Sequence, residues 1–589
     1  MTDMVRHGWT GRILEVYLGS RTSRVIEPPA WLYDKFIGGK GLAGHYLSQH
    51  LDMEWDDPDM PILIFAGPLV GTRAPTSGRA TVMSRSPLTG TVGDSSVGGG
   101  LGTKIKQARY DGIILRGSSD KWIGVEIVDD EVAFVDATPL LGLTNGDAME
   151  LLAGKGSVAL VGPAAQRGVR FSSLMVDRHF AAARNGIGLS FAKKRIKYLS
   201  CDGGTRVPVH DAGELDRARE DIFRLVSASP ILLGESGIRN MGTPALYDLM
   251  HTRRMMPTDN FRTTFFPDAP NLNAYAVKKR YSPRRKGCAG CHILCKKGSA
   301  DGVVLPEFET LSHFTALIGN NDLHTAVRAN VLCNEYGIDT ISAAVTLSCF
   351  AEIEGEDLTP DRIMEILGQI VRREGIGDQL ADGSALWAAS RGKPSSSMSV
   401  KGLELPAYDP RGAYGMALAY ATSTRGGCHL RAYPIGHEIL RKPVATDRFS
   451  FAGKARIIKI AEDTNAVIDS LTACKFVFFA SSLEEYAHAL SAVTGVETTA
   501  TDLSKTGERI YYHERIMNAR WGFNSKDDDL PPRFFEEAGS SGPDFDVPPL
   551  NRDDFLRARA RYYKVRGLDA DGAPTRDKAK ELDLEWNDL

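Results

Sequence analysis

Three cysteines, Cys288, Cys291 and Cys295, lie within eight residues of one another on a basic segment. Each iron of a cubane iron–sulfur cluster takes one thiolate, so three closely spaced thiols and a distant fourth suit such a cluster. Structural zinc favours two paired halves, and the chain has no second Cys-x-x-Cys pair. Three free thiols on an exposed loop would be prone to oxidation. The spacing therefore predicts a cubane iron–sulfur cluster.

The fourth ligand must come from elsewhere in the chain, and Cys474 is our choice. It follows Asp469, at the point where a predicted helix ends. Its rivals are Cys201, Cys333, Cys349 and Cys428. Cys333 and Cys349 lie on apolar helical stripes, where a buried core thiol is the default interpretation. Cys201 follows a predicted strand and has no ligand-like neighbour.

Length and composition describe a globular protein of several domains. A chain of 589 residues has room for about three domains of typical size. Hydrophobic residues make up 42% of it and charged residues 25%, which is ordinary for a protein with ample core. The formal charge of −3 gives no polyelectrolyte signal, so we expect neither nucleic acid nor an acidic membrane surface as a partner.

The expected location is the cytoplasm. Residues 1–10 are too polar for a signal peptide, so we expect no export. No segment approaches the ~20 apolar residues that cross a bilayer, so we expect no membrane insertion. Cysteines grouped as ligands in such a chain favour a reducing compartment.

Short strands separated by turns fill the first third of the chain, to about residue 202. These segments are rich in β-branched and aliphatic residues and are bounded by Gly, Pro, Asp or Ser. The predicted strands are residues 12–18, 61–65, 80–84, 112–116, 123–128 and 158–161.

Two glycine-rich segments, residues 98–102 and 184–188, each lead into a short helix and then a strand. Free backbone N–H groups and the positive end of the helix dipole can hold an anion at such a place. The candidate contacts are Gly98, Gly99, Arg184, Asn185 and Gly186, with Arg79 as a further one. Two cradles suggest two phosphates or one diphosphate-like group. For either segment alone, glycines that only permit a tight turn are the simpler interpretation, and a dinucleotide fold lacks its acidic residue.

Helical periodicity replaces the strand pattern after about residue 208. The predicted helices are residues 212–228, 306–318, 323–336, 339–352, 361–374, 453–470, 483–494 and 503–521. Gly337 is placed to end one helix and Asp339 to cap the next. Glu309 starts an apolar helix and His429 lies in a glycine-rich turn, but spacing alone lifts neither above an ordinary structural role.

Motifs along nearly the whole chain resemble the tungsten-containing aldehyde:ferredoxin oxidoreductase family and occur in the family's order. They are residues 8–14 (GWTGRIL), 37–43 (IGGKGLA), 66–69 (AGPL), 86–90 (SPLTG), the cysteine cluster, 306–310 (PEFET), 409–412 (DPRG), 425–431 (RGGCHLR) and 562–567 (YYKVRG). The resemblance implies an α+β fold. An N-terminal double β-sheet domain, residues 1–206, would form the base for the cofactor. Two mostly α-helical domains, 207–405 and 406–589, would follow.

The resemblance also implies the cofactors and the residues that hold them. The cofactor is tungsten or molybdenum held by two pterins whose phosphates share a magnesium ion, with a [4Fe–4S] cluster nearby. By position, the cluster ligands are Cys288, Cys291, Cys295 and Cys474. Pterin contacts fall at Asp339 and Asp469, and the residues near the phosphates and magnesium are Arg79, Ser96, Arg184 and Asn185. Glu309 and His429 become the acid/base pair.

Three departures from the family pattern stand out. The chain has Thr472 and Ala473 before Cys474, where the family often has Gly-Leu. It has Ser96 where an amide is common, so a magnesium contact there would need the backbone carbonyl. The helix at 323–336 lacks the Glu-x-x-His that binds an iron between subunits in some members, so no such iron is expected.

The implied reaction is oxidation of an aldehyde with water to a carboxylic acid. Glu309 would act as base, His429 would donate a hydrogen bond to the carbonyl oxygen, and electrons would leave one at a time through the cluster. Ferredoxin, or iron–sulfur and flavin subunits, would accept them, and an oligomer is expected. The alternative is the catalytic subunit of a class II benzoyl-coenzyme A reductase complex. A pure electron carrier would not need this scaffold.

The cysteine segment is flanked by many cations, which predicts a docking face for an acidic partner. They are Lys278, Lys279, Arg280, Arg284, Arg285, Lys286, Lys296 and Lys297. A solvated basic face is the simpler alternative.

Overall fold

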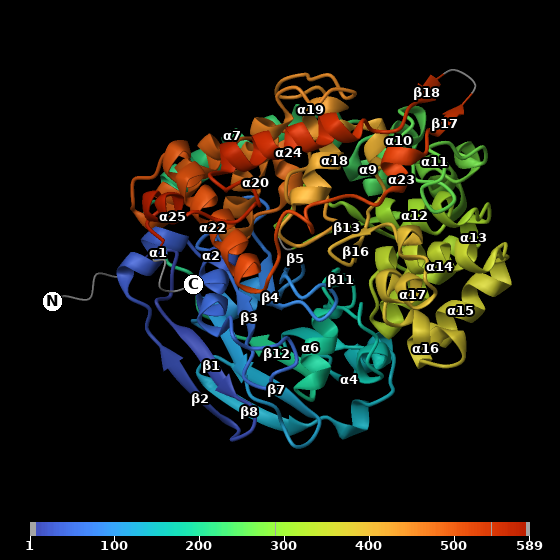
Figure 1. Cartoon of the computed structure of the whole chain (residues 1–589). Helices are drawn as coiled ribbons and strands as arrows, with labels where there is room; N and C mark the ends of the chain where they lie inside the picture. The colour runs from blue at the N-terminus through green and yellow to red at the C-terminus, as the bar shows by residue number, and fades with distance from the viewer. Residues whose placement is uncertain (1–6, 289, 543–544, 585–589) are drawn as a thin grey trace.

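The computed structural model describes residues 7–288, 290–542 and 545–584. Most of the N-terminal segment interpreted above, residues 1–6, therefore lies outside the described residues. Two β-sheets form the N-terminal third, and helices build the rest of the molecule around one side of them (Figure 1).

The first sheet has six strands in the order β2-β1-β6-β3-β4-β5. Only β1 and β6 run parallel within it, and the other neighbours are antiparallel. The strands are β1 (Ile13–Tyr17), β2 (Thr22–Ile26), β3 (Ile62–Phe65), β4 (Ala80–Arg85), β5 (Val92–Val97) and β6 (Gly112–Arg116).

The second sheet also has six strands, in the order β11-β10-β9-β12-β7-β8, with β7 and β12 parallel. The strands are β7 (Ile123–Val128), β8 (Glu131–Asp136), β9 (Ser157–Val161), β10 (Leu174–Val176), β11 (Phe180–Ala182) and β12 (Ile196–Asp202). The predicted double-sheet base is therefore confirmed.

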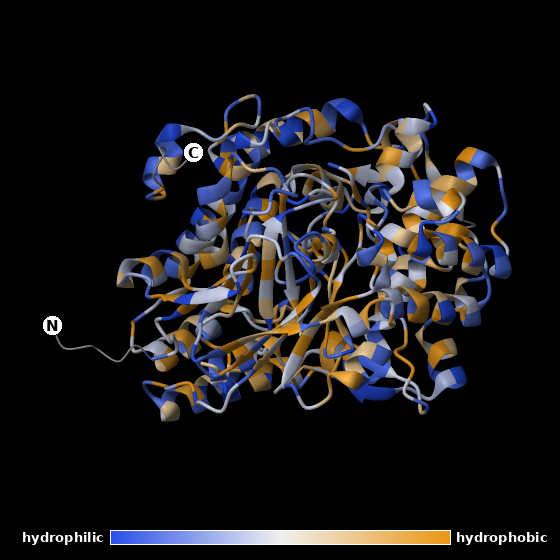
Figure 2. Cartoon of the chain, turned by 90° about the horizontal axis from the view of Figure 1, so that it is seen from below, coloured by the Kyte–Doolittle hydropathy of each residue, from blue (hydrophilic) through white to orange (hydrophobic). Residues whose placement is uncertain are grey.

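Alternation along the strands explains why the two sheets stack. Leu14 and Val16 of β1 share one buried core with Val125 and Ile127 of β7. Because side chains alternate between faces, Ile13, which precedes Leu14, joins a different core that is shared with the helices. The first sheet is thus covered on both faces. Apolar residues are frequent in the strands at the centre of Figure 2.

Helices that matter for the base domain are short. They are α1 (Ala30–Phe36), α2 (Gly39–Leu47), α3 (Leu101–Gln107), α4 (Asn145–Leu151) and α6 (Ile187–Lys193). The main helices of the rest of the chain are α7 (Ala212–Ser227), α11 (Ala274–Tyr281), α12 (Phe308–His313), α13 (Leu323–Tyr336), α14 (Thr340–Glu354), α15 (Pro360–Arg372), α17 (Ser384–Ser390), α18 (Tyr414–Thr422), α20 (Lys454–Leu471), α21 (Leu483–Thr494), α22 (Ala500–Arg520) and α24 (Arg552–Arg566).

Every predicted strand and helix is present, with one helix shorter than expected. The segment 306–318 forms α12 and then a separate 3₁₀ turn, Ala316–Ile318. Gly337 ends α13 with φ 76°, and the Asp339 side chain accepts from the Ser342 N–H at 2.8 Å to cap α14, as predicted. Cys201 lies within β12 rather than after a strand.

The two six-stranded sheets end with β12, and the chain is mostly helical from α7 onward, with only two-stranded sheets after it. The domain boundary at residue 206 stays a prediction. The division of the helical part at residue 405 stays a prediction. Within the described part of the chain, no helix combines the length and apolar character that a membrane crossing demands.

Candidate active site and cluster site

The C-terminal end of α20 is pressed against the base domain. A Cβ atom on Gly39, at the start of α2, would lie 2.5 Å from the carbonyl oxygen of Asp469, so only glycine fits there. The Thr81 hydroxyl donates to that same carbonyl at 3.1 Å, and the Gly67 N–H donates to the Thr472 hydroxyl at 2.9 Å. These contacts fix the segment that carries Asp469 and Cys474.

The three clustered cysteines lie in a loop between two short paired strands, β13 (Arg284–Lys286) and β14 (Lys296–Gly298). This loop reaches the first glycine-rich turn, because a Cβ on Gly98 would come 2.6 Å from the Cys288 sulfur. Cys474, which follows α20, is held near the base domain, because its N–H donates to the Thr76 carbonyl at 3.0 Å.

Arg79 is the cation that these thiols share. Burial would lower its pKa, but Cys474, Cys288 and Cys295, as thiolates, outweigh burial and raise it. Its guanidinium donates to the Ser96 hydroxyl at 2.8 Å and to the Ser96 carbonyl at 2.5 Å. Both oxygens of Ser96 therefore face Arg79, which leaves the magnesium contact predicted for Ser96 without support from this arrangement.

The four thiols that are predicted to bind a cluster are free. None of the eight cysteines is in a disulfide. Burial raises the pKa of Cys474 to about 11, and it also raises that of Cys291 and Cys295, so all three are protonated thiols until a metal displaces the proton. Among the described residues no three Cys, His, Asp or Glu side chains converge on one ion position. A cubane spreads its ligands over four irons and requires no such convergence.

Buried polar atoms without a hydrogen-bond partner accompany the predicted cofactor residues. They are Arg184 Nη1, Asn185 Oδ1, Glu309 Oε1, Arg425 Nε and Asp469 Oδ1. Each such atom costs about 1–3 kcal/mol if nothing satisfies it, so this set indicates a missing polar group. Guanidinium donors suit phosphate, and carboxylate and amide oxygens suit magnesium or pterin N–H groups. The residues therefore fit a phosphorylated pterin cofactor with magnesium.

Arg184 and Asp339 lie on one side of this set. Arg184 uses Nη2 to bind the carbonyls of Glu404 at 2.5 Å and Gly427 at 2.8 Å. Its Nη1 lies 4.0 Å from Asp339 Oδ2. Asp469 shows a similar division, because Oδ2 pairs with Lys475 at 2.7 Å while Oδ1 has no partner. In both residues the protein holds one half of the group and leaves the other half available.

The two glycine-rich turns have fewer free backbone N–H groups for an anion than the sequence suggested. The Gly100 N–H at the start of α3 donates to the Asp177 carboxylate at 2.6 Å, so the protein supplies its own anion there. The Gly188 N–H in α6 donates to the Ser172 carbonyl at 3.1 Å. Neither amide is available to a phosphate, and phosphate contact at Gly98, Gly99 or Gly186 stays a prediction.

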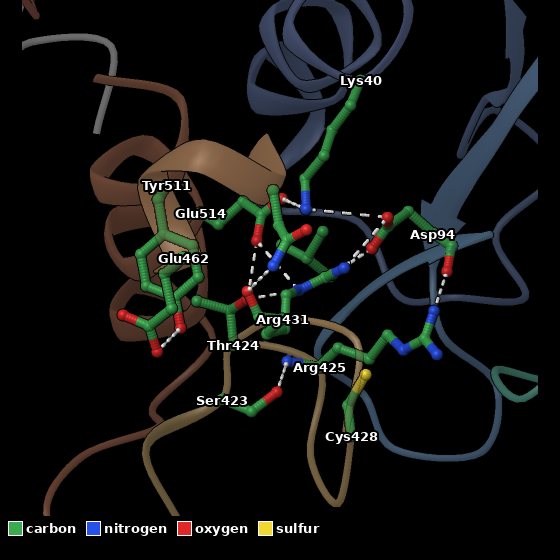
Figure 3. A network of polar contacts seen from close by, with 12 residues as sticks. Lys40, Asp94, Ser423, Thr424, Arg425, Cys428, Arg431, Glu462, Tyr511 and Glu514 are labelled. Carbon is green, nitrogen blue, oxygen red and sulfur yellow. Dashed lines mark hydrogen bonds and ion pairs between the residues drawn. The ribbon is translucent and has the colours of Figure 1, made fainter. Parts of the chain in front are cut away.

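A buried charge network holds the turn that carries His429, and sequence reasoning missed it (Figure 3). Arg431 pairs with the Asp94 carboxylate, and Arg425 donates to the Asp94 carbonyl at 2.7 Å. Lys40 lies 3.6 Å from Asp94 and 2.5 Å from Glu514. Burial would raise the pKa of Asp94, but Arg431 and Lys40 hold it far below the usual range. In the sequence, the only sign of this network was that Lys40, Arg425 and Arg431 lie within the 37–43 and 425–431 motifs.

Glu309 and His429, the predicted acid/base pair, lie side by side. His429 Nε2 lies 3.4 Å from Glu309 Oε1, and the Ala407 N–H donates to Glu309 Oε2 at 2.7 Å. Burial raises the pKa of Glu309 to about 8. Burial, followed by the charges of Arg184 and Arg425, holds the pKa of His429 well below 6.5. At neutral pH the pair is therefore a carboxylic acid beside a neutral imidazole.

Comparison with known families settles the assignment of the chain. Residues 13–203 match the family described as aldehyde ferredoxin oxidoreductase, N-terminal domain, and residues 217–584 match domains 2 and 3 of the same family. The chain belongs to the aldehyde ferredoxin oxidoreductase family. Iron–sulfur and pterin cofactors are typical of this family of tungsten-containing oxidoreductases.

Curated relatives match over almost their whole length. The tungsten-containing aldehyde ferredoxin oxidoreductases of Pyrococcus furiosus and Thermococcus kodakarensis are 34% and 35% identical, with 98% of this chain and 99% of each relative covered. Among solved structures, the active site complex BamBC of benzoyl coenzyme A reductase with 1,5-dienoyl-CoA has the same fold. Its TM-score is 0.83 at 22% identity, over 98% of both chains.

Proposed function

We propose that this family member oxidises aldehydes with water to carboxylic acids and passes the electrons through a [4Fe–4S] cluster to ferredoxin or partner subunits. The observation that carries the proposal is the Glu309 and His429 pair, 3.4 Å apart beside buried groups that fit a pterin cofactor. Tungsten, or molybdenum, held by two pterins with magnesium between their phosphates would supply the two-electron redox chemistry when bound.

Glu309 is oriented to act as a base. The Ala407 N–H holds Oε2, which leaves Oε1 without a partner and directed toward His429. A separation of 3.4 Å is longer than an ordinary hydrogen bond, so Oε1 is free to take a proton from an attacking water molecule. A pKa near 8 gives a base that is strong enough for this transfer and partly ionised at neutral pH.

His429 is a neutral ring with one N–H. Glu309 faces Nε2, so the nitrogen on the far side of the ring, Nδ1, would carry the proton that is donated to the aldehyde oxygen. Burial keeps His429 neutral, so it stabilises the developing negative charge as a hydrogen-bond donor and does not release a proton to solvent.

The test uses the purified holoenzyme and a viologen acceptor, with a panel of aldehydes and benzoyl-coenzyme A as substrates. Tungsten, molybdenum and iron are measured in the same preparation. Glu309→Gln should keep metal and cluster but lose at least ~10²-fold in aldehyde turnover, the usual scale for general acid–base catalysis. The matched control is Glu307→Gln, two residues away, whose carboxylate pairs with Lys296 at 2.9 Å. Wild-type turnover by the Glu309 variant would refute the assignment.

Benzoyl-coenzyme A reduction would be the correct assignment if the wild-type protein reduces that thioester and oxidises no aldehyde in the panel. The shared fold does not separate the two reactions, because 22% identity supports the architecture alone.

A further inference from the structure

Aromatic rings gather around the Glu309 and His429 pair. Tyr408 lies 5.6 Å from His429, and Tyr433 lies 6.1 Å from it, measured between ring centroids. Phe479 continues the group at 5.7 Å from Tyr433. The interplanar angles are 38°, 62° and 45°, so the rings are tilted relative to one another and do not form one flat stack.

These rings come from segments that already define the site. Tyr433 follows the turn that carries His429, and Phe479 ends the 3₁₀ turn Lys475–Phe479 that begins after Cys474. Tyr408 is 2% exposed and forms the back of the group, whereas Tyr433, Phe479 and His429 are only partly buried. Tyr433, Phe479 and His429 thus keep some exposed surface beside the buried Tyr408.

The two tyrosine hydroxyls satisfy each other. Tyr408 Oη and Tyr433 Oη are 3.0 Å apart, and burial raises the pKa of both phenols, so both stay neutral. Tyr408 and Tyr433 therefore contribute only uncharged rings and hydroxyls to the aromatic group. Three cations act on His429 from nearby. Lys475 pairs with Asp469, and Arg425 donates to the Asp94 carbonyl. Arg184 binds two carbonyls through Nη2, and its Nη1 is left for the predicted cofactor.

We propose that Tyr433 and Phe479 are specificity-determining residues that make uncharged aromatic aldehydes the preferred substrates. The proposal rests on the proposed function and names the substrate class for the same site. An aromatic ring that carries the aldehyde would pack edge-to-face or offset against these side chains, while its carbonyl oxygen accepts from His429 Nδ1. A saturated ring of the same size would lose the quadrupole interaction but keep most of the burial.

The experiment compares benzaldehyde with cyclohexanecarbaldehyde, with acetaldehyde as a ring-free reference, on the holoenzyme with a viologen acceptor. Wild type should prefer benzaldehyde in kcat/KM. Tyr433→Leu and Phe479→Leu should each lower the benzaldehyde to cyclohexanecarbaldehyde ratio by about 2- to 10-fold, the range for one aromatic pair. Tyr433→Phe keeps the ring and should keep the ratio, which a general loss of packing would not allow.

The control is Trp31→Leu, which removes an aromatic side chain that is 53% exposed in α1. Its ratio should equal that of wild type. The inference is overturned if wild type oxidises acetaldehyde but treats the two ring aldehydes alike, or if both leucine variants keep the ratio. If the metal-loaded protein oxidises none of the three aldehydes, the proposed function fails and the substrate class fails with it.

Discussion

Burial at the active site shifts the pKa values of acidic and basic residues in opposite directions. It favours the neutral form of every group, so it raises the pKa of Glu309 and lowers that of His429. The same effect keeps Tyr408 neutral. At neutral pH these groups are therefore mostly uncharged. Of the three, only Glu309 has a pKa close to physiological pH.

Aldehyde turnover should therefore rise with pH through an apparent pKa of about 8, because only ionised Glu309 can act as base. Among the charged groups that face Glu309, Arg184 favours its ionised form, whereas Asp339 and Glu307 oppose it. The neighbouring His429 and Tyr408 stay neutral over this interval. The profile of kcat/KM, from about pH 6 to about pH 10, checks this. A flat profile in the wild-type enzyme would contradict Glu309 as base.

Cys474 and Cys333 give a second residue-level prediction. Cys474→Ala should remove or cripple the iron–sulfur cluster, because one iron of a cubane would lack its thiolate. Cys333 is 0% exposed in α13 within an apolar core, so Cys333→Ala should leave the cluster intact. Iron content and the paramagnetic signal of the reduced cluster distinguish the two variants. A normal signal from the Cys474 variant would remove this residue from the ligand set.

At the scale of elements, the junction after α20 combines strain with a buried hydrogen bond. Thr472 has φ 52°, a left-handed conformation that β-branched residues rarely adopt and where the family often has glycine. Its hydroxyl accepts from the Gly67 N–H at 2.9 Å, which ties the end of α20 to the base domain. The departure noted in the sequence is thus compensated by a contact that glycine could not make.

Thr472→Val should lower the free energy of unfolding by about 1–3 kcal/mol, since it keeps the shape of the side chain but leaves a buried N–H unpaired. Thr501→Val, at an exposed position in α22, should change stability by less than about 0.5 kcal/mol. Chemical denaturation of both variants measures the difference. Equal stability of the two proteins would mean that the Thr472 hydroxyl contributes nothing to the junction.

Local rules predicted the elements well and the interior of the site poorly. Gly337 and Asp339 reveal a helix end and a cap because backbone geometry demands those residue types. The exposed strand β2 was missed because it has no buried face to create alternation. The pairing of Lys40 with Glu514 joins residues far apart in sequence, and no local pattern encodes it. The Glu309 and His429 pair was found by family resemblance, not by spacing.

On the scale of the whole molecule, the cysteine loop sits at a basic surface. Five of the eight flanking cations are exposed: Lys278, Lys279, Arg280, Arg284 and Arg285. Lys296 instead pairs with Glu307, and Lys297 is 5% exposed and donates to the Leu294 carbonyl at 2.8 Å. Lys286 lies 3.3 Å from His179. The predicted docking face is therefore smaller than the sequence suggested, and only the exposed members can meet a partner.

If this face docks an acidic ferredoxin or iron–sulfur subunit, reduction of that partner should fall steeply as ionic strength rises, because steering between exposed charges is screened within about 10 Å at about 0.1 M salt. The double variant Arg284→Glu and Arg285→Glu should slow reduction of the protein partner, but it should not slow reduction of a small viologen. Both side chains are exposed, so the fold and the cluster should survive the change.

The matched control replaces Arg561 and Lys564, two exposed cations of α24, with glutamate. This variant should reduce both acceptors at the wild-type rate. Stopped-flow reduction of each acceptor, at low and at high salt, measures the effect. Equal slowing with both acceptors would place the defect in the cluster or the chemistry, because a small dye needs no docking face. No slowing with either acceptor would mean that electrons leave elsewhere, and the basic surface would then be only a solvated face that balances acidic charge in the rest of the chain.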